Sequence, residues 1–173
     1  MGSPSVRYVA LLRGVNVNGI TIRSADLKAL FESSGFEDVK TVQASGNVLF
    51  DAAAANGLKQ QVETALRERF GYDAWIVLRR HDEMAAIVAA CPFAADSDER
   101  HAYVIFGSDP AILRELADSD EAHAEGVVAG DGVLYWGVAR GSTLETPFAK
   151  VLAKAKYKPH VTTRNIRTVM RLA

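Results

Sequence analysis

The pattern of apolar and polar positions changes abruptly near the start of the chain. Residues 6–12 are mostly apolar, and Arg13 then introduces a segment, 14–19, that contains only glycine, valine and asparagine. A short apolar run closed by glycine and asparagine is typical of a buried strand followed by a tight loop. We therefore expect a strand over residues 6–12 and, after it, a loop in which a rigid scaffold holds polar side chains.

The next apolar positions predict two helices and further strands. Apolar residues at helical spacing follow Ser24, a good N-cap, and stop before Gly35, which suits a helix end. A second amphipathic segment stops in the same way at Gly71. Apolar and β-branched runs predict strands over 39–43, 48–50 and 75–78. The resulting order, β-α-β-β-α-β, is ferredoxin-like.

Residues 44–47 form a small, turn-prone cluster between two of these predicted strands. Two strand-like runs separated by such a cluster indicate a hairpin. A single strand with a bulge at the cluster is the competing interpretation.

The second half of the chain repeats this order of elements. A strand is predicted over 103–106, and Asp109 followed by Pro110 is a strong signal for a helix start. The remaining signals predict strands 125–129 and 133–138 around a turn at 130–132, a strand over 159–162 and a final helix over 165–172. A further helix is predicted from 146, or one turn earlier if Ser142 and Glu145 form a capping box.

The predicted fold class is therefore α+β, with two ferredoxin-like (β-α-β-β-α-β) subdomains that contain antiparallel sheets. We expect an N-terminal subdomain over residues 1–80, a linking helix and loop over 81–100, and a C-terminal α+β subdomain over 101–173. The polar stretch 96–100 favours a boundary there.

Ferredoxin-like topology brings two polar segments together. The first two strands run in the same direction, so the loop after the first strand and the turn before the third lie at one end of the sheet. Residues 13–16 are then expected beside residues 45–47. The guanidinium of Arg13 suits a carboxylate or phosphate, and the glycines allow close approach of the backbone.

Composition and charge limit the possible functions. With 49% hydrophobic residues, 24% charged residues and a net charge of −1, the chain has the composition of a soluble globular protein. No apolar run is long enough to cross a bilayer, no signal-peptide pattern is present, and Cys91 is the single cysteine. We expect a cytoplasmic protein without a membrane partner.

The average charge conceals a basic C-terminal segment. No acidic residue follows Glu145, whereas an acidic stretch over 118–125 precedes it; the basic residues after Glu145 are Lys150, Lys154, Lys156, Lys158, Arg164, Arg167 and Arg171. A solvated basic face beside a solvated acidic loop is one interpretation. A basic wall that meets an anion is the other, and nucleic-acid binding, although compatible with it, is not favoured by the net charge.

Other chemistry has little support in the sequence. The histidines, His81, His101, His123 and His160, are scattered, so we expect no metal site. Residues 13–19 match neither the Walker loop nor the G-x-G-x-x-G pattern, and Ser45 is not in a nucleophile elbow. No catalytic residue or cofactor can be named, and whether the protein is an enzyme stays open.

Three segments of the chain have the character of motifs: an opening over 8–17, a segment over 42–48 that contains Ser45-Gly46-Asn47, and a closing segment over 162–169. Together they resemble the bacterial DUF1697 family, a family of unknown function. Asn18 stands where the family usually has glycine, and Ile166 where it usually has tryptophan. The resemblance covers the whole chain and implies α+β architecture with ferredoxin-like subdomains.

With this resemblance, the polar motifs predict one site. We expect a polar cleft between the subdomains that binds a small phosphate- or carboxylate-bearing molecule; its residues would be Arg13, Gly14, Asn16, Ser45, Gly46, Asn47, Arg164 and Asn165. The alternatives are nucleic-acid binding through the basic C-terminal segment, and a structural or partner-binding module in which a hydrogen-bond network clamps the two halves without a ligand.

Overall fold

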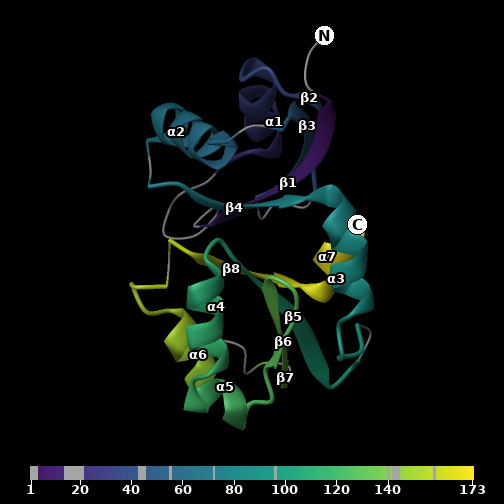
Figure 1. Ribbon diagram of the computed structural model, residues 1–173, viewed down its shortest axis with the longest axis vertical. Coiled ribbons are helices and arrows are strands. Elements are labelled where there is room, and N and C mark those ends of the chain that lie inside the picture. Colours follow the sequence, from purple (N-terminus) through teal and green to yellow (C-terminus); the bar gives the residue numbers. More distant parts are fainter. Residues whose placement is uncertain are drawn as a thin grey trace. The chain divides into compact units, whose positions relative to one another are not determined.

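The computed structural model describes residues 4–13, 22–42, 46–54, 56–71, 73–95, 97–139, 141, 145–157 and 159–173. The chain forms two compact units, Met1–Glu83 and Met84–Arg171. Each unit has one four-stranded antiparallel sheet with helices packed on it (Figure 1). Across the described residues, no helix is long and apolar enough to span a membrane.

The first unit has the ferredoxin-like arrangement that the sequence predicts. Its elements are β1 (Ser5–Arg13), α1 (Ser24–Ser33), β2 (Glu37–Thr41), β3 (Asn47–Ala53), α2 (Leu58–Phe70), β4 (Trp75–Arg80) and the 3₁₀ turn η1 (His81–Glu83). The strand order is β2-β3-β1-β4. Helices α1 and α2 cover one face of the sheet, where Phe31, Phe50 and Leu66 form the core (Figure 1).

The interruption at residues 44–47 separates two strands. Lys40 pairs with Leu49 and Thr41 with Val48 in an antiparallel ladder. The hairpin interpretation is therefore confirmed, and the single bulged strand is wrong.

The second unit repeats the arrangement. Its elements are α3 (Met84–Ala89), β5 (Arg100–Gly107), α4 (Pro110–Ala117), α5 (Asp120–Ala124), β6 (Val128–Ala129), β7 (Val133–Ala139), α6 (Pro147–Leu152), β8 (Val161–Asn165) and α7 (Ile166–Leu172). The strand order is β6-β7-β5-β8. Ile105, Leu116 and Trp136 lie in the core on the helix-covered face.

Side-chain caps explain why the helices of this unit begin where they do. Asp109 accepts a hydrogen bond from the backbone N–H of Ala111 at 2.9 Å, and Thr146 accepts one from Ala149 at 3.1 Å. In each case proline occupies the first helical position, where its missing N–H has no consequence. Both predicted helix starts are confirmed.

The acidic stretch differs from the prediction of a loop followed by a long strand. Ser119 accepts a hydrogen bond from the N–H of Ala122 at 3.2 Å and caps α5. Asp120 and Glu121 lie in the first turn, where negative charge is favourable. Because α5 and the turn after it extend through Gly126, β6 has only two residues instead of the predicted five over 125–129.

Residues 84–95 pack within the second unit. The hydroxyl of Tyr135 on β7 donates a 2.6 Å hydrogen bond to the carbonyl of Ile87 on α3. A Cβ atom at Gly137 would lie only 2.9 Å from the ring of Phe93. Arg167 donates to the carbonyl of Ala95 at 2.9 Å. Most of the segment that the sequence indicates as a linker is thus bound to the second sheet.

Candidate functional site

The end of β1 lies beside the turn that joins β2 to β3. Leu11 pairs with Asn47, and the backbone N–H of Leu12 donates a 2.8 Å hydrogen bond to the carbonyl of Gly46. Arg13 follows immediately as the last residue of β1. The described parts of the two polar segments are therefore neighbours in the first unit. The predicted site residues Gly14, Asn16 and Ser45 lie outside the described residues.

Arg13 is on the sheet face opposite the helices. Ala10 and Leu12 point into the core beneath α1 and α2, so the alternation along β1 directs Leu11 and Arg13 to the other face. Across the ladder Arg13 pairs with Trp75 of β4. The residue is half-buried, and burial lowers the pKa of its guanidinium from the ordinary value because solvent is lost. Arginine stays charged at neutral pH even so.

Asn47 is fully buried and closes the turn. Its side-chain Nδ2 donates to the carbonyl of Val42 at 2.9 Å, and the N–H of Val42 donates back to the carbonyl of Asn47 at 2.9 Å. Gly46, between them in sequence, has a φ of 79°, which glycine adopts without strain. The side-chain amide of Asn47 thus ties the start of β3 to the residue that follows β2.

Arg164 and Asn165 lie on β8 in the second unit. Arg164 is 8% exposed and donates to the Thr162 hydroxyl at 2.6 Å and to the Thr163 carbonyl at 3.1 Å. The Asn165 side-chain oxygen accepts from the N–H of Arg167 at 2.9 Å and caps α7. Both side chains support local structure. That they share a cleft with Arg13 stays a prediction.

Two buried or half-buried carboxylates have contacts that the sequence does not indicate. Glu63 of α2 accepts hydrogen bonds from the backbone N–H of Ile76 at 3.0 Å and from Lys59 at 2.9 Å. Glu125 accepts from the Trp136 indole at 3.2 Å and from the backbone N–H of Phe148 at 2.7 Å. Each one ties a helix or a turn to a distant segment, which is a structural role.

Metal chemistry has no support in the part of the chain that the structure describes. There, no group of three or more histidine, cysteine, aspartate or glutamate side chains is placed to hold a metal ion. The Cys91 thiol donates a weak hydrogen bond to the carbonyl of Phe93 at 3.6 Å.

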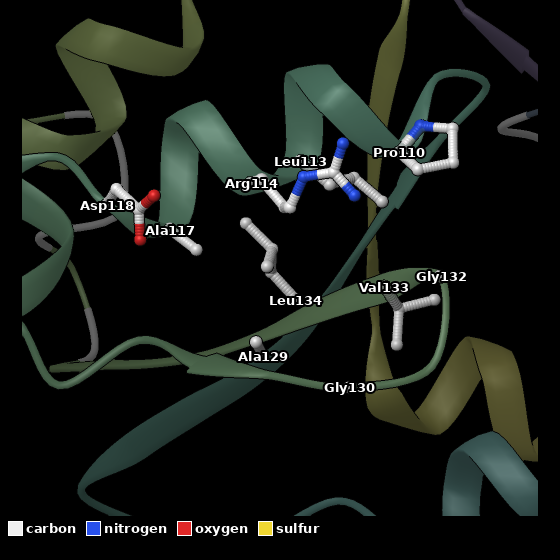
Figure 2. Close-up of a pocket in the computed structure, with 10 residues that line it drawn as sticks. All are labelled: Pro110, Leu113, Arg114, Ala117, Asp118, Ala129, Gly130, Gly132, Val133 and Leu134. Atoms are coloured by element: carbon white, nitrogen blue, oxygen red, sulfur yellow. The ribbon is translucent and has the colours of Figure 1, made fainter.

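A pocket in the second unit was not predicted from the sequence. It lies between α4 and the β6–β7 hairpin and has a volume of about 340 Å³. Leu113, Leu134 and Ala129 contribute apolar surface, and Arg114 and Asp118 contribute charge (Figure 2). The volume is at the lower end of the range for small-molecule sites. We call this cavity the α4–hairpin pocket.

Comparison with one solved structure supports the fold. A conserved bacterial protein from Streptococcus pneumoniae is similar over 98% of this chain and 97% of its own, with 24% sequence identity and a TM-score of 0.81. An unknown protein from Galdieria sulphuraria matches 94% of this chain and 98% of its own at 16% identity, with a TM-score of 0.29. No curated protein matches the chain significantly. A family model described as "Protein of unknown function (DUF1697)" matches residues 6–135.

Proposed function

Because the chain belongs to the DUF1697 family, whose function is unknown, we propose from its own residues that it binds a small phosphate- or carboxylate-bearing ligand. The first unit would hold the ligand at the end of β1, and Arg13 would be the principal contact. The observation that carries the proposal is the half-buried guanidinium of Arg13 at the end of β1, directly before a segment of the sequence that is rich in glycine and asparagine.

An anion matches the electrostatic situation of Arg13. A guanidinium that has lost part of its solvation gains more from a charged partner than a fully hydrated one does. Its planar fork of N–H groups binds carboxylate or phosphate in a bidentate manner. We propose that backbone N–H groups of the segment that contains Gly14 and Asn16 add further donors.

Gly46 and Asn47 supply a support beside this site. Paired hydrogen bonds join Val42 to Asn47, and the bond from Leu12 to Gly46 holds this part of the chain against the end of β1. Ser45, which precedes Gly46 in the sequence, is proposed to donate its hydroxyl to the same ligand. Gly46 and Asn47 would act as positioning residues.

Arg164 and Asn165 enter the proposal as a second set of ligand contacts. Their local hydrogen bonds support the alternative in which these polar motifs serve folding. Separate variants at Arg13 in the first unit and at Arg164 in the second therefore test the two sets of proposed ligand contacts one at a time.

The test is isothermal titration calorimetry of the full chain with inorganic phosphate, citrate and adenosine monophosphate. Arg13→Ala is expected to weaken binding of the best ligand by at least about tenfold, the loss typical of a charged hydrogen bond. Arg67→Ala, an exposed arginine on α2 of the same unit, is the matched control and should leave the affinity unchanged.

The outcomes separate the alternatives. An affinity that Arg13→Ala leaves unchanged removes Arg13 from the site and overturns the proposal. A loss with Arg164→Ala as large as that with Arg13→Ala supports the shared set of contacts. A lower melting temperature without any change in affinity assigns Arg164 to folding alone.

Nucleic-acid binding is the second candidate, and the structure gives it less support. In the basic C-terminal segment Lys156 forms a 2.6 Å salt bridge with Glu115, Arg164 is buried, and Arg167 is bound to the Ala95 carbonyl. A phosphate-binding surface needs basic side chains that are available to the backbone of the nucleic acid. Electrophoretic mobility shifts that are present at low salt and fall steeply with salt would reinstate this candidate.

The proposal includes a cytoplasmic location. It is favoured by a single cysteine, Cys91, which leaves no intramolecular disulfide to stabilise the fold outside the cell. Fractionation of cells that express the chain tests the location directly.

A further inference from the structure

The α4–hairpin pocket lies at the turn end of the β6–β7 hairpin. On the hairpin it is lined by Ala129, Gly130, Gly132, Val133 and Leu134, and on the helix side by residues from Pro110 to Asp118 at the C-cap of α4. The cavity between these two segments has a volume of about 340 Å³.

The floor of the pocket is apolar. Ala129 pairs with Leu134 in the β6–β7 ladder, so both side chains lie on the face that α4 covers. Figure 2 shows Leu134 pointing from β7 toward α4 and Ala129 pointing into the same gap. Leu113 of α4 closes the cavity from above. Such a floor favours a ligand with aliphatic side chains.

The helix side of the pocket carries two opposite charges. Arg114 and Asp118 are four residues apart and therefore on one face of α4 and its C-cap. Their Cα atoms are separated by about 6 Å along the helix axis. Among the residues that the structure describes, neither side chain takes part in a salt bridge or a side-chain hydrogen bond. Figure 2 shows the guanidinium directed toward Pro110, away from Asp118, so the two charges mark opposite ends of the pocket.

A short peptide with free termini carries a matching pair of charges. A dipeptide has its ammonium at one end and its carboxylate at the other, which is the arrangement that opposite charges at the two ends of the pocket would bind. Its side chains would occupy the apolar floor. In addition, β6 is the edge of its sheet, and edge strands pair readily with added peptide backbone.

We propose that the α4–hairpin pocket binds an apolar dipeptide-like zwitterion, with Asp118 receiving the ammonium, Arg114 the carboxylate, and Leu113 and Leu134 the side chains. The ligand lies wholly within the second unit. This site is independent of the anion site proposed at Arg13, and either one can fail without the other.

The probe is leucyl-leucine, titrated into the full-length ¹⁵N-labelled chain and followed by amide chemical shifts. Saturable shifts are expected at Leu113, Gly130 and Leu134. N-acetylation of the probe removes its positive charge and should weaken binding about tenfold, and amidation of its C-terminus should do the same.

Charge-matched variants assign each end of the ligand. In Asp118→Asn, leucyl-leucine and its N-acetyl derivative should bind equally weakly, because the partner of the ammonium is gone. In Arg114→Ala, leucyl-leucine and its C-terminal amide should bind with equally low affinity, because the partner of the carboxylate is gone. Asp98→Asn and Arg171→Ala, which change exposed charges elsewhere in the unit, should retain the parent affinity.

Filling the cavity provides a test that does not depend on charge. Ala129→Phe places a ring in the gap from an exposed edge-strand position and should abolish the saturable shifts while the remaining spectrum stays dispersed. No saturable shift in the parent chain up to about 10 mM probe overturns the proposal. Parent-like affinity in Ala129→Phe also overturns it. The proposal is overturned as well if the two control variants lose as much affinity as Arg114→Ala and Asp118→Asn.

Discussion

Asn47 and Val42 hold each other through two hydrogen bonds. The side-chain amide of Asn47 donates to the Val42 carbonyl, and the Val42 N–H donates to the Asn47 carbonyl, both at 2.9 Å. Because Asn47 has no exposed surface, water cannot replace these contacts. The pair closes the β2–β3 turn at the end of β1.

Replacement of Asn47 by alanine should destabilise the first unit. The change leaves the Val42 carbonyl without its side-chain donor, and we expect a loss of about 1–3 kcal/mol in the free energy of unfolding. Urea denaturation followed by circular dichroism measures it. The exposed Gln60→Ala is the control and should change the stability by less than about 0.5 kcal/mol. Equal effects of the two changes would contradict a clamping role for Asn47.

Glu63 should be important for the attachment of α2 to β4. Its carboxylate, on a residue that is 6% exposed, accepts from the Ile76 N–H at 3.0 Å, so Glu63→Ala removes the acceptor of a buried donor. We expect a loss of about 1–3 kcal/mol in unfolding free energy. Glu63→Gln keeps an oxygen acceptor and should lose less. Glu68→Ala, on the exposed side of the same helix, is the control. A glutamine variant as unstable as the alanine variant would show that the charge, not the acceptor, matters.

Glu125 joins three parts of the second unit. One carboxylate oxygen accepts from the indole of Trp136 on β7, and the other accepts from the N–H of Phe148 in the first turn of α6. Glu125→Ala should lower the unfolding free energy by about 2–4 kcal/mol, because it removes two hydrogen bonds to a charged acceptor. Trp136 fluorescence in a denaturant titration reports the change close to the site. The exposed Glu145→Ala should leave the transition midpoint unaltered.

Gly107 should not tolerate a side chain. A Cβ atom there would lie 2.6 Å from Cγ of Leu113, which is closer than carbon atoms approach without displacement. We expect Gly107→Ala to destabilise the fold by about 1–3 kcal/mol through overpacking. In the Leu113→Ala background the clash is absent, so the same glycine substitution should have a much smaller effect. Additive losses in this double-mutant cycle would rule out the clash.

Local sequence signals were sufficient to predict the order of elements in the first unit and, except for α5, in the second. Asp109 and Thr146 are caps followed by proline, and Gly71 has a φ of 68° at the end of α2, as expected for a terminating glycine. Such signals act within a few residues of the chain and do not depend on tertiary contacts. Local signals also contain α5, because Ser119 followed by two acidic residues is a helix start.

Candidate site residues were less predictable, because polar residues in turns have several uses. In the sequence, Asn47 is compatible with a ligand contact or with a turn clamp, and only its complete burial identifies the clamp. Arg164 and Asn165 likewise have partners on β8 and α7 that become evident once the strand and helix boundaries are known. Arg13, by contrast, is half-buried at the strand end where the pattern places it.

The apolar run that ends at Arg13, the helix caps and the alternation of apolar residues by themselves determined that this chain folds into two β-α-β-β-α-β units. Tertiary structure alone decided which polar groups are buried, because burial depends on segments far apart in the sequence. It also decided that a pocket opens between α4 and the β6–β7 hairpin, since the segments that line that cavity are more than ten residues apart in the sequence. Helix caps can be anticipated from neighbouring residues, whereas empty space between elements arises only when they pack.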